Sequence, residues 1–230
     1  GGSSGLATIL FSDVRGFTPL SERLGPQATV ALLNRYLTLM VGCIEAEGGL
    51  LDKFIGDAVM AVFGLPVRHE DDGLRAVRAA LELTAGLSAL SDALAAEEEI
   101  RLGIATGVNT GEVVVRSIRK DDLHADYVPV GHSTNLAARM EQLATPGTIV
   151  VSAYTQRLTD GYFVFKDLGL TQIKGAEEPL YIYEVQGAGP LRTRLQVAAR
   201  RGLTRFVGRQ SELEQLQRAL ESAKAGHGQI

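Results

Sequence analysis

The chain has 230 residues, of which 45% are hydrophobic, and a formal net charge of −4 at pH 7. This length is enough for one domain of ordinary size plus an appendage. Cys43 is the only cysteine, which excludes a disulfide within the chain and fits a reducing, cytoplasmic setting. We expect no membrane span, because no apolar run approaches the roughly 20 residues needed to cross a bilayer.

The charge is unevenly distributed along the chain. Residues 1–189 carry 15 Lys and Arg against 24 Asp and Glu, whereas residues 190–230 carry 8 against 3. The acidic main part argues against nucleic-acid binding. The basic tail is more typical of a solvated helix face than of a membrane or nucleic-acid contact.

The first predicted elements are a strand and two helices. Residues 1–5 resemble a linker or tag remnant and are left out of the fold prediction. Residues 7–12 are predicted to form a strand, and residues 18–24 a short helix that breaks at the following glycine and proline. Between Val30 and Ile44 apolar residues recur every three or four positions, which predicts an amphipathic helix ending near the glycines at 48 and 49.

A Gly-Asp pair then separates two apolar runs, residues 50–55 and 58–63. Glycine at the first central position favours a type II′ hairpin turn, so Asp57 is expected at a hairpin tip. A turn aspartate is by itself most often simply solvated. Asp13, however, is a second carboxylate at a strand end, just before Gly16. Two carboxylates on neighbouring strands could hold two divalent ions, and N–H groups opening a helix suit a phosphate.

Helices and strands alternate over the rest of the chain. Helices are expected at 69–96, 133–143 and 152–158, and strands at 100–115, 127–131, 148–151, 162–168 and 180–185. The polar run 116–126 is expected to be a flexible loop. Because the hairpin requires antiparallel pairing, we predict an α+β fold of the ferredoxin-like type. In it, helices pack on an antiparallel or mixed sheet.

Four motifs follow one another along the chain: FSDVRGFT at 11–18, KFIGD at 53–57, GHSTNLAARM at 131–140 and IKG at 173–175. In this order and spacing they resemble the catalytic domain of class III nucleotidyl cyclases. The resemblance covers residues 6 to 185 and is to adenylyl cyclases, including the bicarbonate-responsive soluble type.

The resemblance assigns the metal and phosphate contacts. Asp13, Asp57 and the backbone carbonyl of Val14 would bind two Mg²⁺ or Mn²⁺ ions per site. The backbone N–H groups that would bind the β- and γ-phosphates belong to Gly16, Phe17 and Thr18.

The resemblance also assigns contacts to the rest of the nucleotide. Lys53 would read the purine, as in adenylyl cyclases, and Lys174 would contact the polyphosphate. Asn135 would orient the ribose, and Arg139 would stabilise charge developing on the α-phosphate. Val128 stands at the second base-reading position, where the family usually has Asp or Thr. Since valine cannot hydrogen-bond the purine, this departure bears on base selectivity more than on activity.

The implied function is an adenylyl cyclase that converts ATP to cyclic AMP and pyrophosphate by a two-metal mechanism. In the family the site lies between two protomers, and this chain holds both sets of residues, so the resemblance implies a homodimer. Two alternatives stay open: a catalytically silent, nucleotide-binding domain that regulates an attached ATPase, and a guanylyl cyclase. A diguanylate cyclase is weaker, because no second acidic residue stands beside Asp57.

The predicted domain limits place the cyclase domain at 6–186 and a linker at 187–202. Residues 203–230 resemble the truncated start of a P-loop ATPase domain with a short helical tail. The glycine-rich phosphate-binding motif of such a domain does not occur in this stretch.

Overall fold

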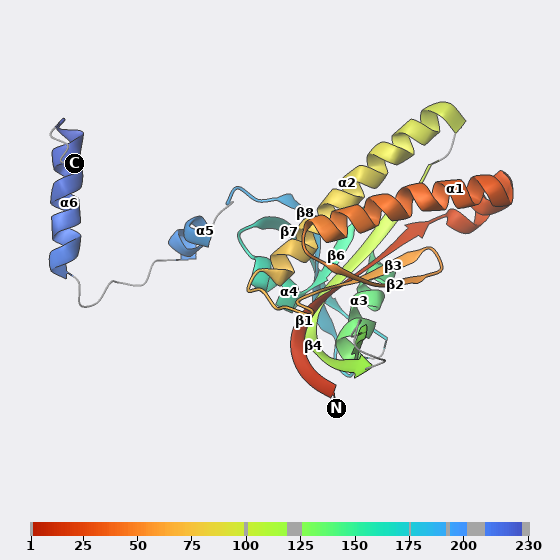
Figure 1. Cartoon of the computed structure of the whole chain (residues 1–230), viewed down its shortest axis with the longest axis horizontal. Helices are drawn as coiled ribbons and strands as arrows, with labels where there is room; N and C mark the ends of the chain where they lie inside the picture. Colours follow the sequence, from red (N-terminus) through yellow and green to blue (C-terminus); the bar gives the residue numbers. More distant parts are fainter. Residues whose placement is uncertain are drawn as a thin grey trace. The chain divides into compact units, whose positions relative to one another are not determined.

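The computed structural model describes residues 2–98, 101–118, 126–174, 176–191, 194–201 and 210–226. The chain divides into two units, Gly1–Pro190 and Leu191–Ile230 (Figure 1). All of the predicted site residues belong to the first unit.

The first unit alternates strands with helices. Its strands are β1 (Gly2–Arg15), β2 (Leu50–Ile55), β3 (Ala58–Phe63), β4 (Gly103–Ile118), β5 (Asp126–Val130), β6 (Ile149–Ser152), β7 (Phe163–Thr171) and β8 (Leu180–Ala188). Its helices are α1 (Phe17–Ala46), α2 (Asp72–Glu98), α3 (His132–Leu143) and α4 (Ala153–Thr159). The second unit contains α5 (Arg194–Arg201) and α6 (Gln210–Lys224).

The strands form one mixed sheet in the order β2-β3-β1-β4-β6-β8-β7, with β5 paired to β4. The β4–β6 pair is parallel, and the other pairs are antiparallel. The predicted α+β class with a mixed sheet is therefore confirmed.

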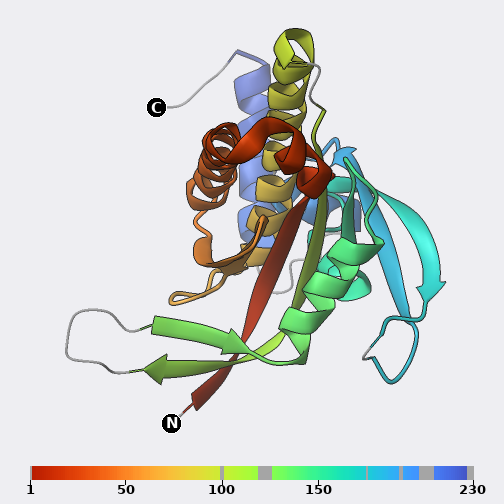
Figure 2. The same cartoon turned by 90° about the vertical axis from the view of Figure 1, so that its right-hand side faces the viewer.

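Side chains of the central strands alternate between two buried faces, as a pleated strand requires. Leu10 and Val59 belong to the main core cluster, which also holds Leu83 of α2 and buried residues of α1. Their neighbours Ile9 and Met60 belong instead to a cluster with Ala137 of α3. Figure 2 shows the same division, with α1 and α2 on one side of β1 and α3 on the other.

The structure corrects the prediction at several element ends. Residues 2–5, left out as a linker, form the beginning of β1 and pair with the far half of β4. β4 reaches residue 118 and β5 begins at 126, so the predicted 116–126 loop is shorter at both ends. Its residues 119–125 lie outside the described residues. The stretch 187–202 holds the end of β8 and helix α5, where a linker was expected.

The predicted break in the first helix is confirmed. α1 is two helical segments joined at Gly25, whose φ of 75° and ψ of 169° are not helical. Pro26 follows, and a proline restricts the preceding residue away from the helical region. The break lets the first turns of α1 run in a different direction from its core-facing part.

Among the described residues, α2 is the helix that is long and apolar enough to be considered as a membrane span. Its segment Asp72–Ala96 has 25 residues and contains an 18-residue window with a mean hydropathy of 1.2, which by length and composition alone would allow a membrane crossing. This is weak evidence for a membrane span, because core helices can have the same length and hydropathy. Val77, Ala80 and Leu83 of α2 are fully buried in the core.

Candidate active site

The two predicted metal-binding aspartates lie side by side. Asp13 is opposite Ala58 in the antiparallel pairing of β1 with β3. Asp57, the residue before Ala58, therefore lies next to it, in the turn between β2 and β3. Gly56 has a φ of 65° in this turn, in the left-handed region that favours glycine. Burial, and then the negative charge of Asp57, raise the pKa of the Asp13 carboxyl above its usual value.

The Asp13 carboxylate is partly free of protein partners. Its Oδ1 atom is buried without a hydrogen bond, and its Oδ2 atom is 4.0 Å from Nε of Arg15. A buried, unpartnered carboxylate oxygen is costly unless something else occupies it. Two adjacent carboxylates with a free oxygen fit a divalent cation such as Mg²⁺ or Mn²⁺.

The rest of the coordination would come from outside the chain. In the described part of the structure, no group of three or more His, Cys, Asp or Glu residues is arranged to hold a metal. Mg²⁺ commonly binds one or two carboxylates and takes its other oxygens from phosphates and water. The buried Val14 contributes no side-chain ligand, and its predicted carbonyl contact stays a prediction.

The N-terminus of α1 follows the first aspartate directly. Gly16 precedes this helix with a φ of 77°, and no side chain caps the first turn. Phe17 packs edge-on against Tyr36, with ring centroids 5.8 Å apart, whereas Thr18 is exposed. Uncapped N–H groups at a helix start attract anions through hydrogen bonds and the helix dipole. This turn can therefore receive a phosphate beside the aspartates.

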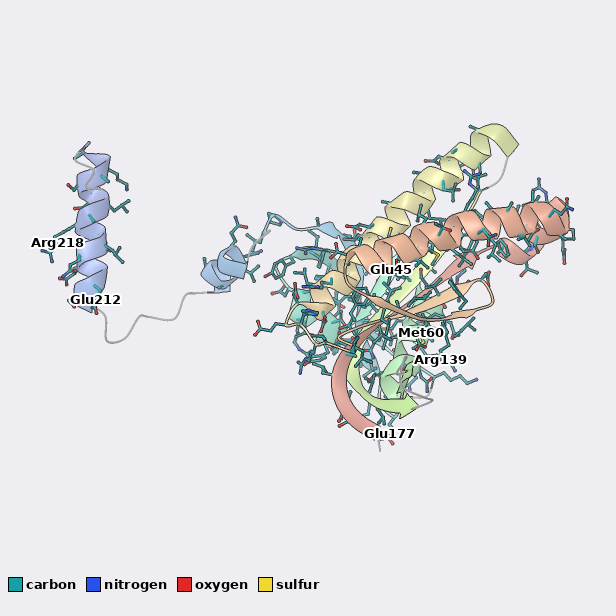
Figure 3. All side chains as sticks on the ribbon, in the orientation of Figure 1. Glu45, Met60, Arg139, Glu177, Glu212 and Arg218 are labelled. Carbon is teal, nitrogen blue, oxygen red and sulfur yellow. The ribbon has the colours of Figure 1, made fainter. Side chains whose placement is uncertain are left out.

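A second group of predicted residues meets at α3. A cleft of about 300 Å³ is lined by His132, Asn135, Leu136, Ala138, Arg139, Gln142 and Lys174. Arg139, labelled in Figure 3, donates a hydrogen bond from Nη1 to Oε1 of Gln142 at 2.8 Å. The structure thus brings Asn135, Arg139 and Lys174 together, with two cations suited to an anionic ligand. Neither Asp13 nor Asp57 lines this cleft.

Lys53 lies on a distorted part of β2. The β2–β3 pairing shifts register between Leu51 and Lys53, so one residue of β2, Asp52, is left over. Such a bulge can bring neighbouring side chains to the same side of a strand. Nζ of Lys53 is 3.4 Å from Oδ2 of Asp52, whose side chain is only 7% exposed. Val128, in β5, is opposite Arg116 of β4.

Helix α3 is held against β4 at close range. A Cβ atom at Gly107 would lie 2.3 Å from the backbone carbonyl of Ala137 and the backbone N of Glu141, so the two backbones touch there. Nδ2 of Asn109 donates to the carbonyl of Ser133 at 2.9 Å. The Ser133 hydroxyl donates to the carbonyl of Glu112 at 2.8 Å. These contacts fix the position of the helix that carries Asn135 and Arg139.

A partly buried ion pair links α3 to the end of β1. Nη2 of Arg15 is 2.6 Å from Oε1 of Glu141 and also donates to the Glu141 backbone carbonyl at 2.9 Å. The pKa of Glu141 is nevertheless raised to about 7, because burial outweighs the attraction of Arg15. The nearby charges of Asp13 and Asp57 add to this rise.

A family model described as the adenylate and guanylate cyclase catalytic domain matches residues 3–187. The chain belongs to this family. It is therefore a nucleotidyl cyclase catalytic domain, and the motifs quoted above lie within the matched range.

Curated relatives of this cyclase domain include adenylate cyclases. Adenylate cyclase 1 of Rhizobium meliloti is 32% identical over 183 residues, which is 78% of this chain and 27% of the relative. The adenylate cyclase of Anabaena cylindrica is 30% identical over 190 residues, which is 78% of this chain and 36% of the relative. The chain thus spans only about a quarter to a third of the length of these two proteins.

Solved structures of both substrate classes resemble the cyclase domain. The adenylyl cyclase CyaB from P. aeruginosa has a TM-score of 0.75 at 34% identity, over 84% of this chain and 97% of that one. The guanylyl cyclase Cya2 has a TM-score of 0.76 at 36% identity, over 83% of this chain and 96% of that one. The two similarities are nearly equal, so overall likeness does not choose between ATP and GTP.

Sequence reasoning missed several residues that shape the site. Glu141, Asn109 and Tyr36 carried no motif signal, because their roles depend on which strand or helix lies opposite them. Arg15 stood inside the first motif, yet its partner is 126 positions away along the chain. The burial of Glu141, which is what makes a charged partner necessary, becomes visible only in the folded structure.

Proposed function

We propose that this domain is an adenylyl cyclase that converts ATP to 3′,5′-cyclic AMP and pyrophosphate. The observation that carries the proposal is the adjacent Asp13–Asp57 pair beside the uncapped start of α1. In this reaction the ribose 3′-oxygen forms a bond to the α-phosphorus. The bond from that phosphorus to the bridging oxygen breaks, pyrophosphate leaves, and the hydroxyl proton passes to solvent. Mg²⁺ or Mn²⁺ held by the two aspartates would lower the pKa of that hydroxyl and stabilise the leaving phosphates.

The cleft residues would act on the other parts of the nucleotide. Arg139 would stabilise charge that develops on the α-phosphate in the transition state, so its contribution would appear in turnover more than in binding. Asn135 would orient the ribose so that its 3′-oxygen faces the phosphorus, and Lys174 would hold the polyphosphate. Gly16, Phe17 and Thr18 would bind the β- and γ-phosphates through their backbone N–H groups.

The choice of ATP rests on Lys53. An ammonium group only donates hydrogen bonds, and adenine N1 accepts one, whereas guanine carries an N–H at that position. The adenylate cyclases among the curated relatives support the same choice. Val128 can contribute only backbone groups to base reading, so we propose ATP as the preferred substrate without strict exclusion of GTP.

We propose that the active form is a homodimer. The two half-sites support this: within the described residues, neither aspartate lines the cleft that holds Asn135, Arg139 and Lys174 on the same chain. If each complete site takes the aspartates from one protomer and the cleft from its partner, the dimer has two sites. A single protomer would then bind parts of the nucleotide without performing the reaction.

The test is product formation from ATP and from GTP with Mg²⁺ or Mn²⁺, beside an Asp57→Ala control. We expect cyclic AMP as the main product and its loss in the control. Cyclic GMP as the main product would identify a guanylyl cyclase. If folded protein binds nucleotide but yields neither product, the regulatory alternative replaces the enzyme.

The remaining proposals rest on the sequence resemblance alone. They are a bicarbonate response, a P-loop ATPase domain following residue 203 in a longer protein, and a cytoplasmic location. Addition of bicarbonate to the same assay tests the first of them directly.

A further inference from the structure

Arg15 stands between two acidic groups and is held by one of them. Both of its short contacts go to Glu141, at 2.6 Å to the side chain and 2.9 Å to the backbone carbonyl. Toward Asp13 its Nε atom is 4.0 Å from Oδ2, which is too far for a hydrogen bond. The Nε atom of Arg15 and the Oδ1 atom of Asp13 are both buried without a hydrogen-bond partner.

Nothing in β1 itself would keep the two side chains apart. Residues two apart on a strand point to the same face, so Arg15 is a close and permanent cation beside Asp13. Arginine–carboxylate pairs are commonly bidentate and strong. A guanidinium bound in that way would occupy the oxygens that a divalent cation needs.

Glu141 is well placed to prevent this pairing. Its side chain is only 5% exposed, whereas that of Arg15 is 35% exposed. The backbone N of Glu141 lies at the close contact between α3 and Gly107 of β4, so this part of α3 cannot shift easily. Glu141 therefore offers Arg15 two acceptors, its Oε1 atom and its backbone carbonyl, on a part of α3 that is held in place.

We propose that Glu141 is a positioning residue that draws Arg15 away from Asp13 and so keeps the Asp13 carboxylate free for a divalent cation. This inference rests on the proposed function, in which Asp13 binds that cation. It adds that metal affinity depends on a residue of α3 that does not touch the metal.

The test is a double-mutant cycle on Mn²⁺ affinity. Free Mn²⁺ is measured by electron paramagnetic resonance, with protein saturated by an ATP analogue whose α–β bridging oxygen is replaced by carbon. Glu141→Gln should weaken Mn²⁺ binding about tenfold while Arg15 is present. In an Arg15→Gln background the same substitution should change it less than about threefold.

The cycle separates this inference from a simple charge effect. If Glu141 acted only through its negative charge, its loss would weaken Mn²⁺ binding by the same factor in both backgrounds. Equal factors, or no effect of Glu141→Gln in either background, would overturn the proposal. Asp71→Asn, which removes the carboxylate paired with Arg75 at the start of α2, is the matched control and should leave Mn²⁺ affinity unchanged.

A second comparison does not touch the buried glutamate. Arg15→Lys keeps the positive charge but has a shorter side chain without the Nη2 atom that donates both contacts to Glu141, so it should bind Mn²⁺ more weakly than wild type. Charge alone predicts wild-type affinity for this variant, and that result would contradict the proposal even if Glu141→Gln fails to fold. Asp13→Ala distinguishes failure of the proposed function, because unchanged Mn²⁺ binding there would remove the metal site itself.

Discussion

The hydroxyl of Tyr36 donates a hydrogen bond to the backbone carbonyl of Asp57, at 3.3 Å. Tyr36 is fully buried, and burial, followed by the charges of Asp57 and Asp13, raises the pKa of its hydroxyl. The hydroxyl therefore stays protonated and can donate at any pH near neutrality. This contact ties the core-facing part of α1 to the hairpin turn that carries one of the two aspartates.

Tyr36→Phe removes this hydrogen bond and keeps the aromatic ring. We expect a loss of about 1 kcal/mol in the free energy of unfolding, the usual contribution of one hydrogen bond. The Mn²⁺ concentration for half-maximal activity should rise severalfold, because the Asp57 turn is less well positioned. Urea unfolding and a Mn²⁺ titration measure the two effects. Tyr181→Phe, at an exposed position of β8, is the control, and an unchanged Mn²⁺ requirement in Tyr36→Phe would show that the tie is only structural.

Asp52→Asn tests how Lys53 is held. The substitution removes the charge that lies 3.4 Å from the ammonium group of Lys53. Without it, Lys53 should adopt more conformations, and the KM for ATP should rise severalfold with little change in kcat. Steady-state kinetics with ATP and GTP would measure this change in KM. Asp52→Glu keeps the negative charge, so its KM for ATP should stay close to the wild-type value. A fall in kcat with an unchanged KM would argue against a role in base reading.

The sequence was most informative where structure is local. The β2–β3 hairpin and the break at Gly25 both follow from short-range chemistry. The extent of β1 was missed because residues 2–5 are Gly and Ser. These residues form a strand because they pair with residues 113–116 of β4, which are far away in the sequence.

In the candidate site, too, the sequence predicted local features and missed long-range contacts. Its motifs located Asp13, Asp57, Asn135 and Arg139, because each stands in a stretch with its own pattern. The motifs did not reveal that Asn135 and Arg139 share a cleft without either aspartate. Nor did they reveal what supports α3, since these contacts join residues of β4 and α3 that no pattern connects.

Gly107→Ala should separate α3 from the sheet. The added Cβ would meet two backbone atoms at 2.3 Å, and backbone cannot move aside as a flexible side chain can. We expect destabilisation of about 3 kcal/mol and loss of most activity, measured by urea unfolding and product formation. Gly42→Ala in α1 is the matched control, because no atom lies within 4 Å of its added Cβ. That change should be neutral or slightly stabilising. A Gly107→Ala protein as stable as wild type would contradict the close packing.

The pKa of about 7 at Glu141 predicts a pH-dependent stability. Arg15 and Asp13 face this group from β1, and Asp57 faces it from the hairpin. Because the folded state binds the proton more tightly than the unfolded chain, the destabilisation is absent below the ordinary value of 4.5. It grows as the pH rises to 7 and is complete above that.

Relative to Glu141→Gln, the wild type should therefore lose up to about 3 kcal/mol of stability between pH 4.5 and pH 8. Urea midpoints of both proteins at several pH values measure this difference. The comparison removes the contributions of carboxyls that both proteins share, Asp13 among them. A difference that stays constant with pH would show that the Glu141 carboxyl keeps an ordinary pKa in the folded protein.

The separation of the two half-sites leads to a prediction about mixed dimers. Asp57→Ala and Arg139→Ala should each be nearly inactive alone, because each damages both sites of a homodimer. In a mixed dimer, the site built from the intact aspartates of one protomer and the intact Arg139 of its partner is complete. The other site lacks both groups. Mixing the two inactive proteins should therefore restore activity, up to about a quarter of the wild-type value, because half of the dimers would be mixed with one working site each.

The measurement is cyclic AMP formation after the proteins are mixed and allowed to exchange subunits. A mixture of Asp57→Ala with Asp13→Ala is the control, since both changes damage the same half-site and no complete site can form. Equal activity in the two mixtures would mean that each chain builds its site alone.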